Sequence, residues 1–316
     1  MSTELRLRLR ESKLRAARVS VISTASLTLV KLVTGALIGS ISVLSEAIHS
    51  ATDLVAAIIA YFSVRASDSP PDDDHPYGHG KIESVSALAE AMLIFGSAIY
   101  ILYEVIDRLR NPHPPHINLL NAGIVVMLLS MIVNTVVSRF LARVARETES
   151  QALSADAAHI GTDAGTSTGV LVGLILARAT GRAWLDPAIA GLVATLLIAI
   201  AFRLLKDALN LLLDIRLPEI EEAKIRTIIE TDQRVRGHHK LRTRKSGSVR
   251  HADVHVLLDD ELTLLAAHSV CEELEDAIRS TFPGVIVNIH IEPYQYEINH
   301  QREVHGVEGD TAGEGR

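Results

Sequence analysis

The stretch "DAAHIGTDAG", residues 156–165, places three titratable side chains at the start of an otherwise apolar segment. The chain continues from there as "TSTGVLVGLILARA". His159 and Asp163 are four residues apart, so on a helix they lie on one face. Ionisable side chains inside a membrane span cost several kcal/mol and usually line a pathway. The stretch therefore predicts a polar site within a membrane helix.

The same pattern occurs a second time, as "EAIHSATD" at residues 46–53. Here His49 and Asp53 take the places of His159 and Asp163. Two imidazoles and two carboxylates supply four nitrogen and oxygen ligands, which suits a tetrahedral Zn²⁺ site. The two outer acids, Glu46 and Asp156, are expected either to support the ligands or to be helix-end charges. Together the two stretches predict a cation site between two membrane helices.

Six apolar runs of roughly 20 residues, about the length that spans a bilayer core, divide the first two thirds of the chain. They lie at about 17–38, 41–64, 84–107, 118–140, 152–177 and 185–209. Buried helices of a soluble all-α protein are the alternative, and the length of the runs and the charged loops between them oppose it. The remaining residues mix polar and apolar side chains and are typical of a soluble domain. We expect a tail at 1–15, a transmembrane domain at 16–212, a C-terminal domain at 213–296 and a disordered tail at 297–316.

Lysine and arginine are concentrated in the N-terminal tail and in the loops after the second and fourth runs. Loops rich in these residues stay in the cytoplasm. The distribution predicts a multi-pass protein of the cell membrane, the inner membrane of a bacterium, with both termini in the cytoplasm. The single cysteine, Cys271, excludes an internal disulfide and any cysteine-based metal cluster.

A second cluster of polar residues follows the second run, in "PPDDDHPYGHGKIES" at residues 70–84. Pro76 and Gly78 predict a turn there. Asp72, His75 and His79 have the character of metal ligands, but an acidic, solvated loop with incidental histidines has the same composition. The sequence leaves both interpretations open.

The C-terminal domain is predicted to have the order α-β-β-α-β, a small sheet with helices on one face. In the last strand Asn288, His290 and Glu292 alternate onto one face. Three histidines from other elements could converge on that face. The candidate ligands of this domain are thus His239, His255, His268, His290 and Glu292. Four other histidines, at positions 238, 251, 300 and 305, are expected at the surface.

Four of these stretches, "SEAIHSATD", "DDDHPYGHGKIES", "ADAAHIGTD" and the closing "VNIHIEP", resemble the cation diffusion facilitator family of divalent-metal transporters. The resemblance extends from about residue 10 to 295, in the same order and spacing. It implies a six-helix transmembrane bundle with a cytoplasmic, metallochaperone-like α+β domain. It also implies a homodimer that exports Zn²⁺ or a related ion from the cytoplasm in exchange for protons.

The resemblance assigns roles to individual residues. The transport site would be His49, Asp53, His159 and Asp163, with histidine at position 49 where many bacterial relatives have aspartate. The loop site would be Asp72, His75 and His79, and Lys81 would pair with Asp214 at the dimer interface. The candidate ligands of the C-terminal domain match positions that bind a pair of zinc ions in the family. Glu292 stands where aspartate is common and Ile291 where some relatives have a polar ligand, so one ion per subunit is the alternative.

Imidazole suits Zn²⁺, whereas manganese prefers carboxylates, so zinc is the expected ion, with Fe²⁺, Co²⁺, Cd²⁺ and Mn²⁺ as alternatives. A membrane metalloenzyme is opposed by the lack of a His-Glu-x-x-His or nucleophile motif. A full four-ligand site also leaves no position for an activated water. We therefore expect a transporter, not an enzyme, with no nucleic-acid partner. A non-transporting metal sensor would not need the ligands in the membrane.

Overall fold

The computed structural model describes residues 3–38, 41–110, 120–180 and 185–305. The chain divides into two compact units, Ser2–Leu212 and Leu213–Arg316. The regular elements described in the first unit are all helices, and the second unit combines helices with a three-stranded sheet.

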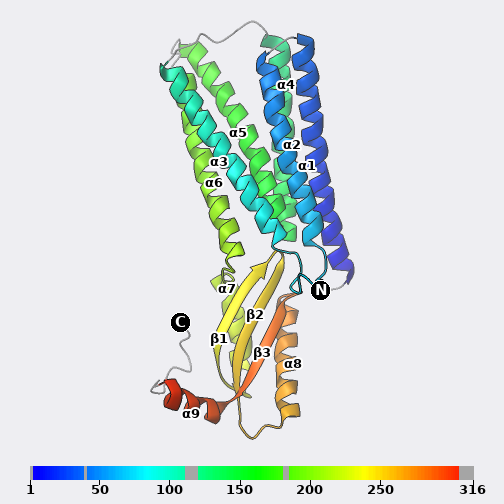
Figure 1. Cartoon of the computed structure of the whole chain (residues 1–316), viewed down its shortest axis with the longest axis vertical. Coiled ribbons are helices and arrows are strands. Elements are labelled where there is room, and N and C mark those ends of the chain that lie inside the picture. The colour runs from blue at the N-terminus through cyan, green and yellow to red at the C-terminus, as the bar shows by residue number, and fades with distance from the viewer. Residues whose placement is uncertain (1–2, 39–40, 111–119, 181–184, 306–316) are drawn as a thin grey trace. The chain divides into compact units, whose positions relative to one another are not determined.

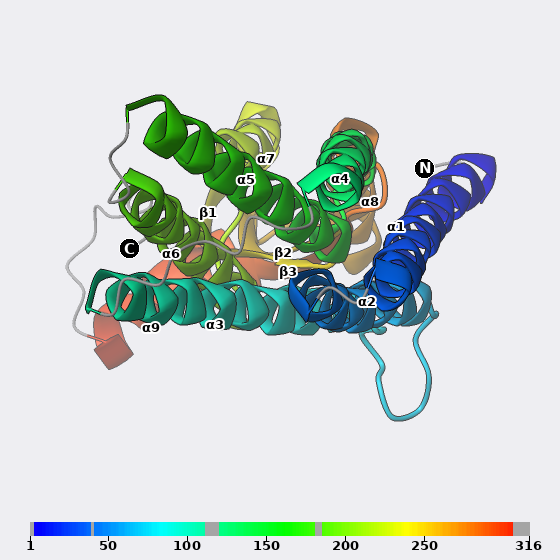
Figure 2. The same ribbon diagram turned by 90° about the horizontal axis from the view of Figure 1, so that it is seen from above.

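The first unit is a bundle of long helices (Figure 1). These are α1 (Thr3–Ile38), α2 (Ile41–Ser67), α3 (Ile82–Arg110), α4 (Leu120–Thr148), α5 (Gln151–Thr180) and α6 (Leu185–Leu212). Seen from above, α3 packs along α6, and α1 packs along α2 (Figure 2). Helix α5 also packs against α4, α6 and α3, and it contacts α2. The two helices with the repeated polar pattern are therefore neighbours.

Four of these helices contain segments long and apolar enough to cross a membrane. The segments are Leu7–Leu37, Ile82–Asp107, Leu128–Thr148 and Ala188–Leu212, on α1, α3, α4 and α6. Helices α2 and α5, which carry the polar stretches, are not among these four in the described residues.

Glycines on α5 allow its neighbours to approach closely. A Cβ atom at Gly161 would lie 2.9 Å from Ser138 Oγ on α4. One at Gly169 would lie 2.5 Å from Val193 Cγ2 on α6, closer than carbon atoms can pack. Small residues let membrane helices come together in this way. The glycine spacing on α5 therefore serves helix packing at these two positions.

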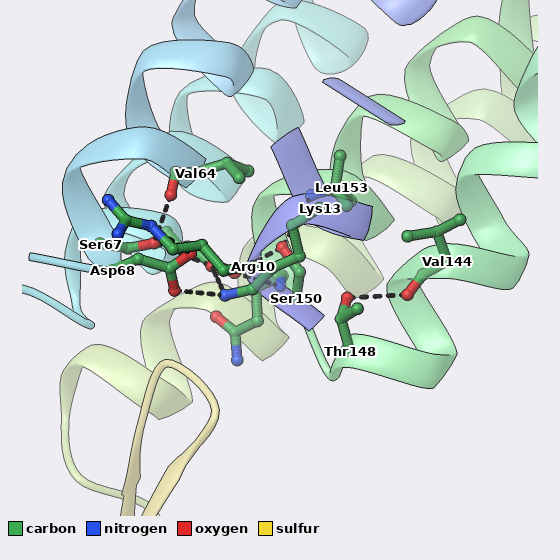
Figure 3. A network of polar contacts seen from close by, with 11 residues as sticks. Arg10, Lys13, Val64, Ser67, Asp68, Val144, Thr148, Ser150 and Leu153 are labelled. Atoms are coloured by element: carbon green, nitrogen blue, oxygen red, sulfur yellow. Dashed lines mark hydrogen bonds and ion pairs between the residues drawn. The ribbon is translucent and has the colours of Figure 1, made fainter. Parts of the chain in front are cut away.

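A buried polar network joins four helices of the bundle at one end (Figure 3). Lys13 Nζ on α1 lies 2.7 Å from Asp68 Oδ1 and 3.3 Å from Glu83 Oε1. Glu83 on α3 also accepts hydrogen bonds from Ser67 Oγ (3.0 Å), from Ser150 Oγ (2.7 Å) and from the backbone N–H of Gln151 (2.8 Å). Because the Lys13 and Glu83 side chains are only 5% and 1% exposed, this pairing is largely shielded from water.

The second unit contains α7 (Glu219–Thr231), β1 (Val235–Ser246), β2 (Val249–Leu258), α8 (Leu264–Thr281), β3 (Ile286–Pro293) and α9 (Tyr294–His305). Strand β2 is central, antiparallel to β1 and parallel to β3. Ile229 from α7, Val254 from β2 and Ile278 from α8 share one buried core. The expected α-β-β-α-β order is confirmed.

Two expectations about this unit are wrong. His251 is 5% exposed, because it lies on central strand β2, and the His238 side chain is 13% exposed. Neither is therefore a surface residue. Residues 297–305, assigned to a disordered tail, belong to helix α9 instead. The side chains of His300 and His305 and all of residues 306–316 lie outside the described part of the chain.

Candidate metal centres

The repeated pattern brings its four polar side chains together between α2 and α5. His159 Nε2 on α5 lies 3.3 Å from Asp53 Oδ1 on α2, although the two residues are 106 positions apart in the chain. His49 Nε2 lies 4.0 Å from the same Asp53 oxygen. Ligand atoms of His49, Asp53 and Asp163 all lie within 4.8 Å of one another. We call these four residues the membrane quartet.

The members of the membrane quartet differ in how far they are exposed. The side chains of His159 and Asp53 are 6% and 11% exposed, while that of His49 is 48% exposed. The His159 Nδ1 atom is buried and has no hydrogen-bond partner among the described residues. The membrane quartet is therefore buried at His159 and Asp53 and accessible from outside the bundle at His49.

Of two buried charged residues near the membrane quartet, Lys31 was missed by sequence reasoning, and two roles were left open for Asp156. Lys31 on α1 is 5% exposed, and its Nζ donates to Ser50 Oγ at 2.7 Å, next to His49. A single lysine within the apolar run 17–38 is the signal that could have identified it. Asp156 is 1% exposed on α5, so it is not a helix-end charge. The side chain of Glu46 lies outside the described residues.

The loop between α2 and α3 brings its predicted ligands together. Asp72 Oδ1 lies 3.3 Å from His75 Nδ1, and Asp72 Oδ2 lies 3.3 Å from His79 Nε2. Gly78, at φ +80°, allows the tight turn that returns His79 toward Asp72. The backbone N–H of His75, which donates to Asp72, and the neighbouring imidazoles lower the pKa of the Asp72 carboxyl. Asp72 is thus an ionised acceptor between two imidazoles.

The second unit brings three predicted ligands together on its sheet. Glu292 on β3 lies opposite β2, with its Oε1 atom 2.7 Å from His255 Nδ1. Its Oε2 atom lies 2.9 Å from His239 Nε2 on β1, but not in hydrogen-bond geometry. His239 Nε2 and Glu292 Oε2 are both buried and have no hydrogen-bond partner among the described residues. His290 Nε2 lies further out, 3.7 Å from Glu292 Oε1.

The titration of this sheet cluster favours metal binding at neutral pH. Burial lowers the pKa of the His239 imidazole below its usual value, and nearby Lys240 and His255 lower it further, against the opposing charge of Glu292. Burial alone would raise the pKa of Glu292, but the hydrogen bond from His255 and the neighbouring cations outweigh it, so the net shift is downward. A neutral His239 and an ionised Glu292 are the forms that bind a metal ion.

Other predicted residues lie outside these clusters in the described structure. His268 on α8 is 63% exposed and pairs with Glu272 at 3.4 Å, so its role as a ligand stays a prediction. Lys81 Nζ donates to the backbone carbonyl of Leu212 at 3.3 Å. Asp214 belongs to the second unit, where it pairs with Arg244 at 3.4 Å. The Lys81–Asp214 pair at a dimer interface also stays a prediction.

Comparison with known proteins now decides the family. Residues 17–213 match the family model of the cation efflux transmembrane domain, and residues 217–294 match that of the cation efflux protein cytoplasmic domain. The chain belongs to the cation diffusion facilitator family. The resemblance seen in the four sequence stretches is therefore confirmed.

Named relatives of this cation diffusion facilitator cover nearly the same length. The cation-efflux pump FieF of Citrobacter koseri is 36% identical over 284 residues, which is 88% of this chain and 92% of that protein. FieF of Cronobacter sakazakii is 36% identical over 279 residues with the same coverage. A solved structure described as the mode of action of a zinc-transporter candidate, CzrB, is 33% identical. It covers 24% of this chain and 96% of its own, with a TM-score of 0.24.

Family membership establishes the general function. This cation diffusion facilitator is a membrane-spanning transporter for metal efflux and not an enzyme. Its C-terminal unit is the cytoplasmic domain of the family. The fold class expected from the sequence, a helical membrane bundle with a C-terminal α+β domain, is confirmed.

Proposed function

We propose that this cation diffusion facilitator exports Zn²⁺ in exchange for protons, and that the membrane quartet is its transport site. The observation that supports the proposal is the meeting of His159 Nε2 and Asp53 Oδ1 at 3.3 Å between two membrane helices. The protein would reside in the bacterial inner membrane with both termini in the cytoplasm.

Zinc fits the donors of the membrane quartet better than the alternative ions. Two imidazoles and two carboxylates match the four-coordinate geometry of Zn²⁺, whereas Mn²⁺ prefers a larger number of oxygen ligands. Fe²⁺, Co²⁺ and Cd²⁺ accept mixed ligands as well. A transport assay with each ion is therefore the way to rank them.

Proton exchange follows from the chemistry of the ligands. A metal ion binds only to neutral imidazoles and ionised carboxylates, so its arrival displaces any protons that they hold. Histidine titrates near working pH, which lets protons compete with the ion on the acidic side of the membrane. Movement of α2 and α5 relative to the other helices would then expose the quartet to each side in turn.

Zinc uptake into proteoliposomes tests the transport proposal. The purified protein is reconstituted with a zinc-sensitive dye inside, and a pH gradient is imposed and then abolished with a protonophore. We expect zinc entry that follows the gradient and stops when the gradient is abolished. Zinc that binds to the protein without crossing the bilayer would instead favour a metal sensor.

The sheet cluster of the second unit and the residues of the loop between α2 and α3 are proposed as further metal sites. His239, His255 and Glu292 would bind regulatory zinc, and the orphaned atoms His239 Nε2 and Glu292 Oε2 support this fit. Asp72, His75 and His79 would form the loop site. The protein would act as a homodimer, held partly by the Lys81–Asp214 pair, and zinc in the cytoplasmic domains would favour the transporting form.

Zinc binding by the sheet cluster should weaken as the pH falls. His239 has a lowered pKa, so its imidazole is neutral at pH 7, and zinc affinity should be constant above that pH. Below the ordinary histidine value of about 6.5, His239 gains a proton as the pH falls through its lowered pKa, and zinc affinity should fall by up to about tenfold per pH unit. Isothermal titration with zinc across this range measures the effect in an Asp163→Ala background, in which the membrane quartet is disabled.

The matching control is the Glu292→Gln variant. Loss of the carboxylate should remove this binding component at every pH, whereas a surface change such as Asp276→Asn should leave it, since the Asp276 side chain is 80% exposed and pairs only with Arg279 among the described residues. A pH-independent affinity in the parent protein would contradict binding by His239. In the metal-free protein, the lowered pKa of His239 also means that stability declines as the pH falls below the unfolded-state value of about 6.5.

A further inference from the structure

A pair of acids lies buried between α3 and α5, outside the membrane quartet. Glu90 on α3 is 0% exposed and Asp156 on α5 is 1% exposed. One turn away on α3, Ala87 packs against Ala155, the neighbour of Asp156. The charge of Asp156 acts directly on Glu90 across this helix contact. The two carboxyl groups therefore share one buried space.

The polar atoms in this space lack partners among the described residues. Glu90 Oε2, both carboxylate oxygens of Asp156 and the hydroxyl of Ser20 on α1 are buried without a hydrogen bond. Ser20 itself is 0% exposed, and it lies close enough for its hydroxyl to act on the Asp156 carboxyl. Glu90 has only a long contact, from Ser86 Oγ to its Oε1 atom at 3.5 Å.

No cation among the described residues reaches Glu90. Lys13 on α1 is engaged by Asp68 and Glu83, two turns before Glu90. On α6, Lys206 and Asp207 next to Ala208 are exposed. His159 on α5 acts on Asp156, three residues away, and not on Glu90.

Two unpaired carboxylates cannot both stay ionised in such a space, because each buried charge without a partner costs many kcal/mol and like charges repel. Among the residues that the structure describes, Glu90 has no positive neighbour, whereas Asp156 faces His159. Glu90 is therefore the carboxyl that stays neutral, and its O–H can donate to Asp156.

We propose that Glu90 is a proton-binding site, separate from the metal ligands, which gives its proton to water on one side of the membrane during the transport cycle and takes up a proton from water on the other side. The site rests on the proposed proton exchange and adds a position for a coupled proton. With the proton bound, Glu90 joins α3 to α5 through Asp156. Without it, two negative charges repel across the contact, which favours movement of α5, the helix that carries His159 and Asp163.

Infrared spectroscopy tests whether Glu90 is protonated. The zinc-free protein in lipid at neutral pH should show the carbonyl stretch of a buried carboxylic acid. This band should disappear in the Glu90→Gln variant and remain in Glu147→Gln, which changes an exposed glutamate on α4. If Glu90→Gln lost intensity only in the carboxylate bands and kept the carbonyl band of the buried acid, Glu90 would be ionised in the parent protein, and the proposal would be overturned.

Proton counting tests whether this proton is exchanged. Protons moved per zinc ion are measured with a pH dye in weakly buffered proteoliposomes. The number should fall by about one in Glu90→Gln, since a carboxyl carries a single proton, while zinc affinity of the membrane quartet is unchanged. The coupling role would be overturned if Glu90→Gln moved as many protons per zinc ion as the parent protein. It would also be overturned if the difference between the two proteins disappeared when choline replaced sodium, because Glu90 would then bind sodium and not a proton.

The two readouts separate this site from the transport proposal. If the parent protein moves zinc without protons, the proposed antiport fails, and the infrared band still reports on Glu90. If antiport occurs and Glu90→Gln behaves like the parent in both assays, only the Glu90 site fails. Asp156→Asn provides a second variant, in which Glu90 should lose its anionic acceptor and its carbonyl band should shift.

Discussion

The Asp53→Asn variant should transport zinc on the order of a hundredfold or more slowly than the parent protein. Asp53 Oδ1 is the atom that both quartet histidines approach, at 3.3 and 4.0 Å. Asparagine keeps the size of the side chain but removes the negative charge that a divalent ion needs in a bilayer. Initial rates of zinc entry into proteoliposomes measure the effect.

The control for Asp53→Asn is Asp207→Asn, which removes an exposed carboxylate from α6. It should transport at nearly the parental rate. Both variants should show parental helix content and elute as the parent does in size-exclusion chromatography. Parental transport by a folded Asp53→Asn protein would mean that the membrane quartet is not the transport site.

Replacing Glu83 by alanine should destabilise the helical unit by about 3–5 kcal/mol, the usual cost of breaking a buried ion pair from one side. Glu83 on α3 binds Lys13 and accepts hydrogen bonds from Ser67, Ser150 and the Gln151 backbone, so α1, α2 and α5 lose a common partner. The loss of stability is measured by heating the detergent-solubilised protein and recording, at each temperature, the fraction that remains monodisperse.

The Glu4→Gln variant is the matched control for Glu83→Ala. Glu4 pairs with Arg8 at 2.7 Å, but both side chains are about three-quarters exposed. Its removal should cost less than about 0.5 kcal/mol, because water and salt screen exposed pairs. The variant Glu83→Gln should lie between the two, since it keeps part of the hydrogen bonding. Equal melting of Glu83→Ala and Glu4→Gln would contradict a stabilising role for the buried network.

Local patterns in the sequence were sufficient for the family, the fold class and the candidate ligands. The spacing of His159 and Asp163, and of His49 and Asp53, places each pair on one helix face because the α-helical repeat is a local property. Alternation in "VNIHIEP" likewise indicates a strand with Glu292 and His290 on one face. These predictions need no knowledge of which elements are neighbours.

The sequence alone also determined where the apolar helices lie, because the length of an apolar run is read directly from consecutive residues. Only the tertiary structure decided which distant residues meet. It placed Glu90 beside Asp156, and Glu83 beside Lys13 and Ser150. It also buried His251, which the sequence placed at the surface. The physical reason is that burial and pairing depend on packing between elements far apart in the chain, and a local periodicity carries no information about that packing.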